Sequence, residues 1–139
     1  MNTYNGFTHR ERARALRWLN AEYAAGRRKR PVVCDACGQT EGLIEAHSED
    51  YSEPHGAHIG AFGFCLTCHL MVHCRFEAPA RWEEYRTAIR AGAVFAPFTG
   101  RNWFGFRGRF LLAATLPEPL CYRARPTRLV LDNEIGVPR

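Results

Sequence analysis

The chain has 139 residues and a mass of 15.8 kDa, with 46% hydrophobic and 24% charged residues. This composition is typical of one globular domain, and the length excludes a large multidomain enzyme. No segment approaches the roughly 18 consecutive apolar residues that a membrane span requires, and the first residues lack the apolar run of a secretory signal. The sequence therefore predicts an intracellular, cytoplasmic protein with no membrane partner.

The formal net charge is +5, and the positive charge is concentrated near the N-terminus. Residues 1–30 contain eight cationic side chains and only two carboxylates, Glu11 and Glu22. Arginine and lysine neutralise backbone phosphates, so this segment predicts a DNA partner; a solvated basic face without a partner is the alternative. The candidate DNA-binding residues are Arg10, Arg14, Arg17, Arg27, Arg28, Lys29 and Arg30.

The first predicted element is a helix over residues 9–25. Thr8 can cap its first turn, and Gly26 can end it. Leu16 and Leu19 would share one face of this helix, with arginines over the other faces. The segment therefore predicts an amphipathic helix with a basic outer surface.

Two short strands and a second helix are predicted next. Residues 43–47 read as a strand, and the polar segment 48–58 reads as a loop. A second strand over 59–64 would lead back to a helical pattern over residues 68–76.

The remaining residues predict a third helix and a strand-containing tail. The helix covers 79–91, with proline at its start and Gly92 as its stop. Segments 110–116 and 129–131 read as strands. The tail aromatics are interleaved with arginines, which suits either packing on the domain or stacking on nucleic acid, and their density favours packing.

These elements predict an α+β fold in three parts. Residues 1–31 form a basic helix and linker, residues 32–92 form the central domain, and residues 93–139 form an extension that packs on the core.

Six cysteines in a chain of this kind indicate metal binding rather than disulfides. Four of them form two C-x-x-C pairs, Cys34 with Cys37 and Cys65 with Cys68. Four thiolates complete a tetrahedral zinc shell with no open position, so the predicted zinc is structural. Chance pairing of buried reduced thiols is the alternative, and the two other cysteines, Cys74 and Cys121, are predicted to be free thiols.

Three histidines form a second candidate metal site. His69 and His73 are four residues apart on the predicted helix and therefore share one face. His47, at the end of the first strand, is the natural third ligand because a strand, loop, strand and helix can bring it over that helix. Three imidazoles favour zinc, nickel or manganese over magnesium. Ordinary hydrogen-bonded helix histidines are the alternative.

Three segments follow one another along the chain: Cys34-Asp-Ala-Cys-Gly38, Glu45-Ala-His-Ser-Glu-Asp-Tyr-Ser-Glu-Pro54 and Phe64-Cys-Leu-Thr-Cys-His69 with His73. In this order they resemble a known family, the HNH endonucleases of the zinc-knuckle, phage and mobile-element type. The resemblance spans about residues 32–92 and implies a ββα-metal fold, in which two strands and a helix surround a catalytic divalent ion beside a structural zinc. It also implies that His47, His69 and His73 are the ligands of that ion.

The sequence departs from the family at the general base. Ser48 stands where the resemblance places the histidine that activates water, and losing such a base typically costs about 10²- to 10⁴-fold in rate. The following loop is longer than usual and carries His55 and His58. Either histidine is a candidate surrogate base, although two exposed loop histidines are the simpler interpretation.

The sequence therefore predicts a metal-dependent DNA endonuclease that hydrolyses phosphodiester bonds with low sequence specificity. The alternative is a catalytically silenced protein of the same fold, a phage or plasmid accessory factor that binds DNA or inhibits another protein. The intact set of three histidine ligands favours the enzyme, and Ser48 favours the alternative. A purely structural zinc domain of a larger assembly is a third interpretation.

Overall fold

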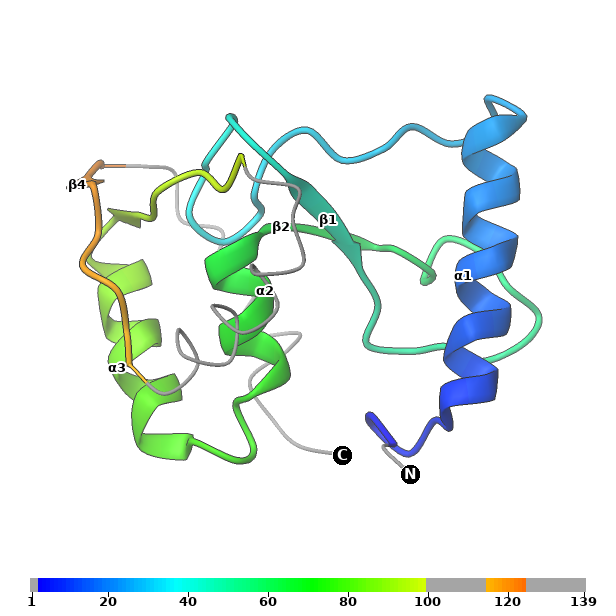
Figure 1. The fold of residues 1–139 in the computed structure, drawn as a ribbon, viewed down its shortest axis with the longest axis horizontal. Helices are drawn as coiled ribbons and strands as arrows, with labels where there is room; N and C mark the ends of the chain where they lie inside the picture. Colours follow the sequence, from blue (N-terminus) through cyan, green and yellow to red (C-terminus); the bar gives the residue numbers. More distant parts are fainter. Residues whose placement is uncertain (1–2, 100–114, 125–139) are drawn as a thin grey trace.

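Three helices and two small antiparallel sheets make up the part of the chain that the computed structural model describes, residues 3–99 and 115–124 (Figure 1). The predicted α+β class is confirmed. The elements are α1 (His9–Ala24), β1 (Ile44–His47), β2 (Phe62–Cys65), α2 (Leu66–His73), α3 (Pro79–Arg90), β3 (Ala93–Val94) and β4 (Cys121–Tyr122).

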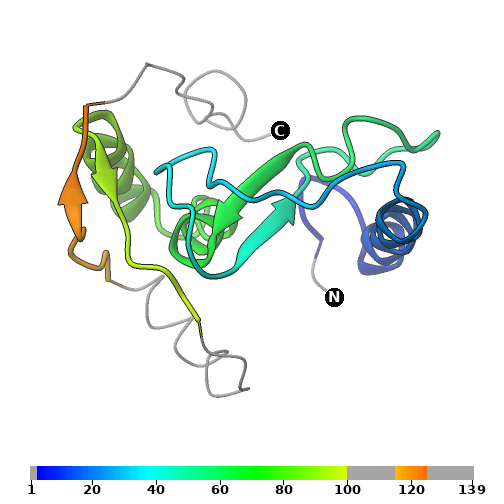
Figure 2. The same ribbon diagram turned by 90° about the horizontal axis from the view of Figure 1, so that it is seen from above.

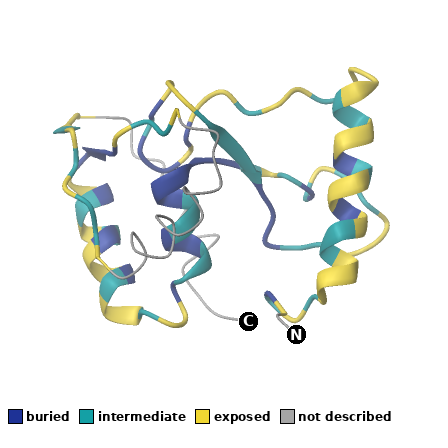
Figure 3. Cartoon of the chain, in the orientation of Figure 1, coloured by how far each residue is buried: buried dark blue, intermediate teal, exposed yellow. Residues whose placement is uncertain are grey.

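Helix α1 lies at one end of the molecule and α3 at the other, with the β1–β2 hairpin and α2 between them (Figures 1 and 2). The predicted N-terminal helix is confirmed. Thr8 and Glu11 form a reciprocal capping box, in which the Thr8 hydroxyl accepts from the Glu11 amide at 3.2 Å and the Glu11 carboxylate accepts from the Thr8 amide at 2.7 Å. Only Ala15 and Leu19 of α1 are buried, and they pack with Ile59 in a small core of their own (Figure 3).

The strands β1 and β2 pair antiparallel, with Ile44 opposite Cys65 and His47 opposite Phe62. The predicted second strand began too early, because residues 59–61 belong to the loop. Gly60 has φ of +62°, which ends the extended backbone there, and a Cβ on it would lie 2.6 Å from a Leu19 methyl. The loop therefore docks against α1 before β2 begins.

Helix α2 starts directly after β2, two residues earlier than predicted, and ends at His73 rather than near residue 76. Cys65 is its N-cap in extended conformation, so the chain turns from strand to helix at that residue. The predicted third helix is confirmed as α3, which buries Trp82, Tyr85 and Ile89. The main core contains buried side chains of α2 and α3 and the four cysteines of the two C-x-x-C pairs.

The C-terminal part contains one pairing that the sequence pattern did not predict. Strand β3 pairs antiparallel with β4, and Phe95, directly after β3, is fully buried in the main core. The predicted strand over 110–116 lies outside the described residues except for Thr115 and Leu116, which are not in a strand. The predicted strand over 129–131 also lies outside them. Among the described residues, no helix has the length and apolar character needed to cross a bilayer.

Candidate metal centres

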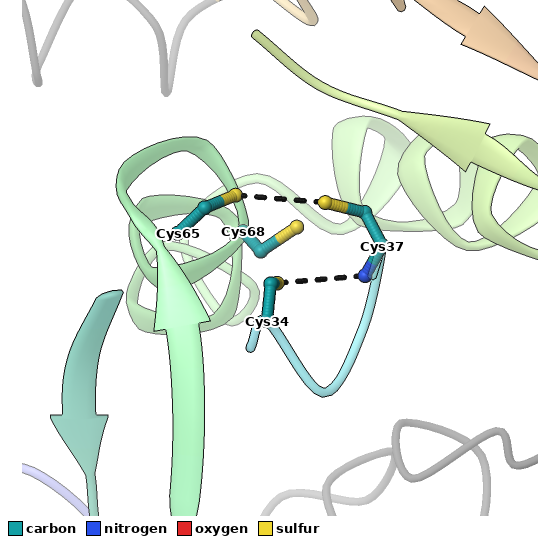
Figure 4. A group of neighbouring side chains, drawn as sticks. All are labelled: Cys34, Cys37, Cys65 and Cys68. Atoms are coloured by element: carbon teal, nitrogen blue, oxygen red, sulfur yellow. Dashed lines mark hydrogen bonds between the residues drawn. The ribbon is translucent and has the colours of Figure 1, made fainter. Parts of the chain in front are cut away.

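The two cysteine pairs come together in one buried cluster (Figure 4). Cys34 and Cys37 lie in the loop that precedes β1, Cys65 ends β2, and Cys68 lies in the first turn of α2. Their four sulfur atoms all lie within 4.8 Å of one another, and the Sγ atoms of Cys37 and Cys65 are 3.7 Å apart. The structure thus brings together all four residues of the predicted site.

The backbone of the first pair forms a tight turn anchored to β2. Gly38 has φ of +78°, which lets its amide donate to the Cys34 carbonyl at 2.9 Å. The Cys37 amide faces the Cys34 sulfur at 3.4 Å. The Asp35 amide donates to the Gly63 carbonyl at 2.7 Å, and the Gly63 amide donates to the Asp35 carboxylate at 2.8 Å. These bonds fix both sulfurs of the turn relative to the strand that carries the second pair.

The cluster has the donors and the spacing for a structural metal ion such as zinc. Zinc with bonds of about 2.3 Å to four thiolates holds neighbouring sulfurs about 3.8 Å apart, close to the separation seen here. Hydrogen bonds with the other three thiols lower the pKa of Cys37, whereas burial raises the pKa of Cys68. Four buried thiolates repel one another unless a cation neutralises them. Cys74 and Cys121 are free and lie outside the cluster, as predicted.

Three imidazoles form the second cluster. His47 ends β1, and His69 and His73 lie one turn apart on α2. The Nε2 atom of His69 lies 3.1 Å from Nδ1 of His47 and 3.1 Å from Nε2 of His73. The structure therefore brings together the three histidines that the sequence singled out.

The electrostatics of this cluster suit a cation. Burial, with the neighbouring imidazoles, lowers the pKa of His73 to about 2, and burial lowers the pKa of His47 to about 4. Both rings are neutral near pH 7, so each presents a lone pair rather than a second N–H. Two imidazoles bonded to zinc at about 2.0–2.1 Å have nitrogens about 3.3 Å apart, which the observed spacing approaches.

Two of these rings also bind a carboxylate through the ring nitrogen that points away from the cluster. The Nε2 atom of His47 donates to Glu49 at 2.6 Å, and Nδ1 of His69 donates to Glu45 at 3.1 Å. Each bond selects the tautomer that leaves the inward nitrogen as an acceptor. Carboxylate–histidine pairs of this kind orient metal ligands and raise their basicity.

Glu49 is the centre of a buried network that the sequence did not reveal. Arg75 donates to the Glu49 carboxylate at 2.5 Å and to the Tyr4 hydroxyl at 2.6 Å. The same carboxylate accepts from the Asn5 amide at 2.8 Å and from the Tyr4 hydroxyl. Burial alone raises the pKa of Glu49, but hydrogen bonds from His47 and Tyr4 and the charge of Arg75 lower it to about 2. The N-terminal segment is thereby attached, through Glu49, to the candidate ligand His47.

Ser48, which stands at the position of the base, and the two candidate surrogate bases all have other contacts in the structure. The Ser48 hydroxyl is buried and accepts from the Gly60 amide at 2.7 Å. The Nε2 atom of His58 donates to a backbone carbonyl within its own loop at 2.8 Å, and the His55 ring packs on Trp18, with 5.6 Å between ring centres. Neither loop histidine lines the cavity beside the histidine cluster, so the structure does not bring these two candidate bases to the site.

A cavity of about 290 Å³ lies beside the histidine cluster. Helix α1, the loop after β1 and helix α2 all contribute to its wall, and several apolar side chains complete it. Sequence analysis did not select His9, which belongs to a helix distant in sequence from the other histidines. The polar residues of the wall are His9, Arg12, Ser48, Tyr51, His69 and His73.

Six of the seven predicted DNA-binding cations are exposed, and Arg28 is half-buried. Three of the exposed cations also contact residues of the chain itself: Arg14 pairs with Glu53 at 2.9 Å, Arg27 pairs with Glu22 at 2.8 Å, and the guanidinium of Arg30 lies 4.6 Å from the centre of the Tyr23 ring. Pairing at the surface reduces the charge that these side chains offer to a phosphate.

Arg28 has a structural role, which leads to a first prediction. Its guanidinium donates to the Ile59 carbonyl at 2.5 Å and lies 5.9 Å from the centre of the Trp18 ring, so it joins the loop to α1. We expect Arg28→Ala to lower the free energy of unfolding by about 2 kcal/mol, since it removes a charged donor from a half-buried carbonyl. Lys29→Ala, the adjacent exposed cation, should change it by less than about 0.5 kcal/mol. Urea denaturation of both variants measures the difference, and equal stabilities would contradict this role.

No protein-family model matches this chain, and neither a curated protein nor a solved structure gives a significant match. The relation to the HNH endonucleases therefore stays a prediction, carried by the spacing of the cysteines and histidines. A function for the chain has to be argued from its own residues.

Proposed function

We propose that this protein is a metal-dependent DNA endonuclease with a ββα-metal core of the HNH type. The observation that carries the proposal is the convergence of one nitrogen from each of His47, His69 and His73, all within 4.8 Å of one another. The His69 nitrogen lies 3.1 Å from each of the other two. Strands β1 and β2 and helix α2 would be the ββα unit. The adjoining cavity is lined by His69 and His73, so a substrate there would reach two of the three rings, while His47 is buried behind them.

The two clusters would hold different ions. The four cysteines form a closed set of sulfur donors, which suits a structural zinc. The three imidazoles leave coordination positions open and favour zinc, nickel or manganese over magnesium, whose preferred ligands are oxygens. This difference in donors is why only the histidine cluster is assigned to catalysis.

The mechanism divides between the ion and the chain. His47, His69 and His73 would hold an ion, which would supply Lewis-acid chemistry for the negative charge on the phosphate and on the leaving oxygen. Glu49 and Glu45 hold the rings of His47 and His69 in the orientation this requires. The exposed cations Arg10, Arg17 and Lys29 would contact flanking phosphates, which gives salt-dependent binding with little sequence preference.

A catalytically silenced DNA-binding or protein-inhibiting factor is the second candidate function. The observation that favours it is Ser48, whose buried hydroxyl already accepts from the Gly60 amide at 2.7 Å. A serine in this environment lacks the proton affinity of a general base. This candidate keeps both metal sites and the basic surface but has no cleavage step.

Plasmid nicking tests the enzyme proposal. We expect the wild-type protein to nick supercoiled plasmid with zinc, nickel or manganese, and we expect His69→Ala to lose at least about 10²-fold of that rate. Metal analysis should find two ions per wild-type chain and one in the variant, whose retained zinc shows that it is folded. Absence of nicking with every ion, magnesium included, would contradict the enzyme. Salt-dependent DNA retention in a gel without nicking would then support the silenced factor.

A further inference from the structure

The side of α1 that faces the cavity carries two polar residues near its start. His9 and Arg12 are three residues apart, so they lie on the same side of the helix, and both line the cavity with His69 and His73. Farther along the same side, Leu16 also lines the cavity. Helix α1 thus lines the cavity with polar side chains in its first turn and with an apolar side chain, Leu16, one turn later.

The contacts of Tyr4 place the beginning of α1 next to the histidine cluster. The ring of Tyr4 lies 4.6 Å from the ring of His73, centre to centre, and its hydroxyl lies 3.4 Å from Nε2 of His47. Only four residues separate Tyr4 from His9. The polar first turn is therefore attached to the same network that holds the proposed metal ligands.

We propose that the first turn of α1 completes the active site, with His9 as the general base and Arg12 as the cation that binds the reacting phosphate. The inference rests on the endonuclease function proposed above. It resolves the difficulty raised by Ser48, because an imidazole from a different element enters the cavity that the serine borders. His55 and His58 are the rival bases, and their rings have other contacts outside this cavity.

The proton and electron balance of the step is simple. A water oxygen forms a bond to phosphorus, and the proton that it loses is taken by an unprotonated ring nitrogen of His9. The bond between phosphorus and O3′ breaks, its electron pair stays on O3′, and that oxygen takes a proton from solvent. The guanidinium of Arg12 stabilises the negative charge of the phosphodiester.

Kinetics of plasmid nicking separate the two roles. His9→Ala should lower kcat by about 10²- to 10⁴-fold with little change in KM, and it should lose the acidic limb of the pH profile of kcat/KM. Added imidazole should restore part of the rate, because it fits the space that the side chain vacates. Arg12→Ala should mainly raise KM. Asn20→Ala, an exposed residue of the same helix outside the cavity, is the matched control and should behave as wild type.

A binding measurement tests His9 without cleavage. In zinc-loaded protein, the Cε1–Hε1 signals of the six histidines can be assigned by substitution and followed by NMR during addition of thymidine 3′,5′-bisphosphate. We expect the His9 signal to move with the nucleotide and to move less in Arg12→Ala. A His9 signal that stays in place while the His55 or His58 signal moves would overturn the inference.

The outcomes distinguish this inference from the function on which it rests. Absence of nicking by the wild-type protein with every ion overturns both the endonuclease and the base assignment. Nicking that survives in His9→Ala, or that is lost instead in His55→Ala or His58→Ala, overturns the base assignment alone.

Discussion

Cys68→Ser is expected to release the structural metal ion and unfold the domain at 25 °C. Cys68 is fully buried, and its cluster is part of the main core. Metal binding to four-ligand zinc sites contributes about 10–16 kcal/mol to folding in small domains, which is comparable to the whole stability of a protein of this size. Without the ion, the thiols no longer connect the loop before β1 to the start of α2. Metal analysis and near-ultraviolet circular dichroism measure the loss.

Cys74→Ser is the matched control, since Cys74 is a free thiol at the C-terminal end of α2 and lies outside the cluster. This variant should keep the metal content and the aromatic circular dichroism of the wild type. Treatment of wild-type protein with a strong chelator should reproduce the unfolding of Cys68→Ser. A cooperative thermal transition that persists after chelation would show that the cysteines do not hold a structural ion.

Arg75→Met is expected to lower the free energy of unfolding by about 3–5 kcal/mol. The Arg75 side chain is 2% exposed and that of Glu49 is 9% exposed, so the substitution would leave a buried carboxylate without its cation. The methionine fills a similar volume, so the loss arises from the charge rather than from a cavity. Because Glu49 orients His47, the same variant should weaken metal binding at the histidine cluster by about 10- to 100-fold. Chemical denaturation and metal titration measure the two effects.

Two further variants separate the buried charge from other effects of the substitution. Arg75→Met combined with Glu49→Gln removes both charges and should regain part of the lost stability, although His47 would stay poorly oriented. Arg14→Met removes the cation of an exposed pair with Glu53 and should cost at most about 1 kcal/mol. Equal losses for Arg75→Met and Arg14→Met would mean that the buried network contributes nothing special.

Local sequence signals were sufficient for the helices and for the ligand sets. The cap at Thr8 and the proline before the Trp82 and Tyr85 stripe predicted α1 and α3 because capping and helical periodicity act within a few residues. The C-x-x-C and histidine spacings predicted both clusters, since a metal shell requires particular side chains at short separations. The boundaries were predicted less accurately. Strand β2 begins after the predicted residue because Gly60 has a positive φ, and α2 begins before the predicted residue because Cys65 is its N-cap.

The sequence by itself determined the α+β class and the two groups of candidate metal-binding side chains, because those depend on local periodicity and on donor chemistry. Only the tertiary structure decided that Glu49 and Arg75 form a buried pair with Tyr4, that His9 lines the same cavity as His69 and His73, and that Arg28 joins the loop to α1. Each of these contacts joins segments that are far apart in the chain. Such contacts are set by how the N-terminal segment and the long loop pack together, and no local pattern encodes that packing.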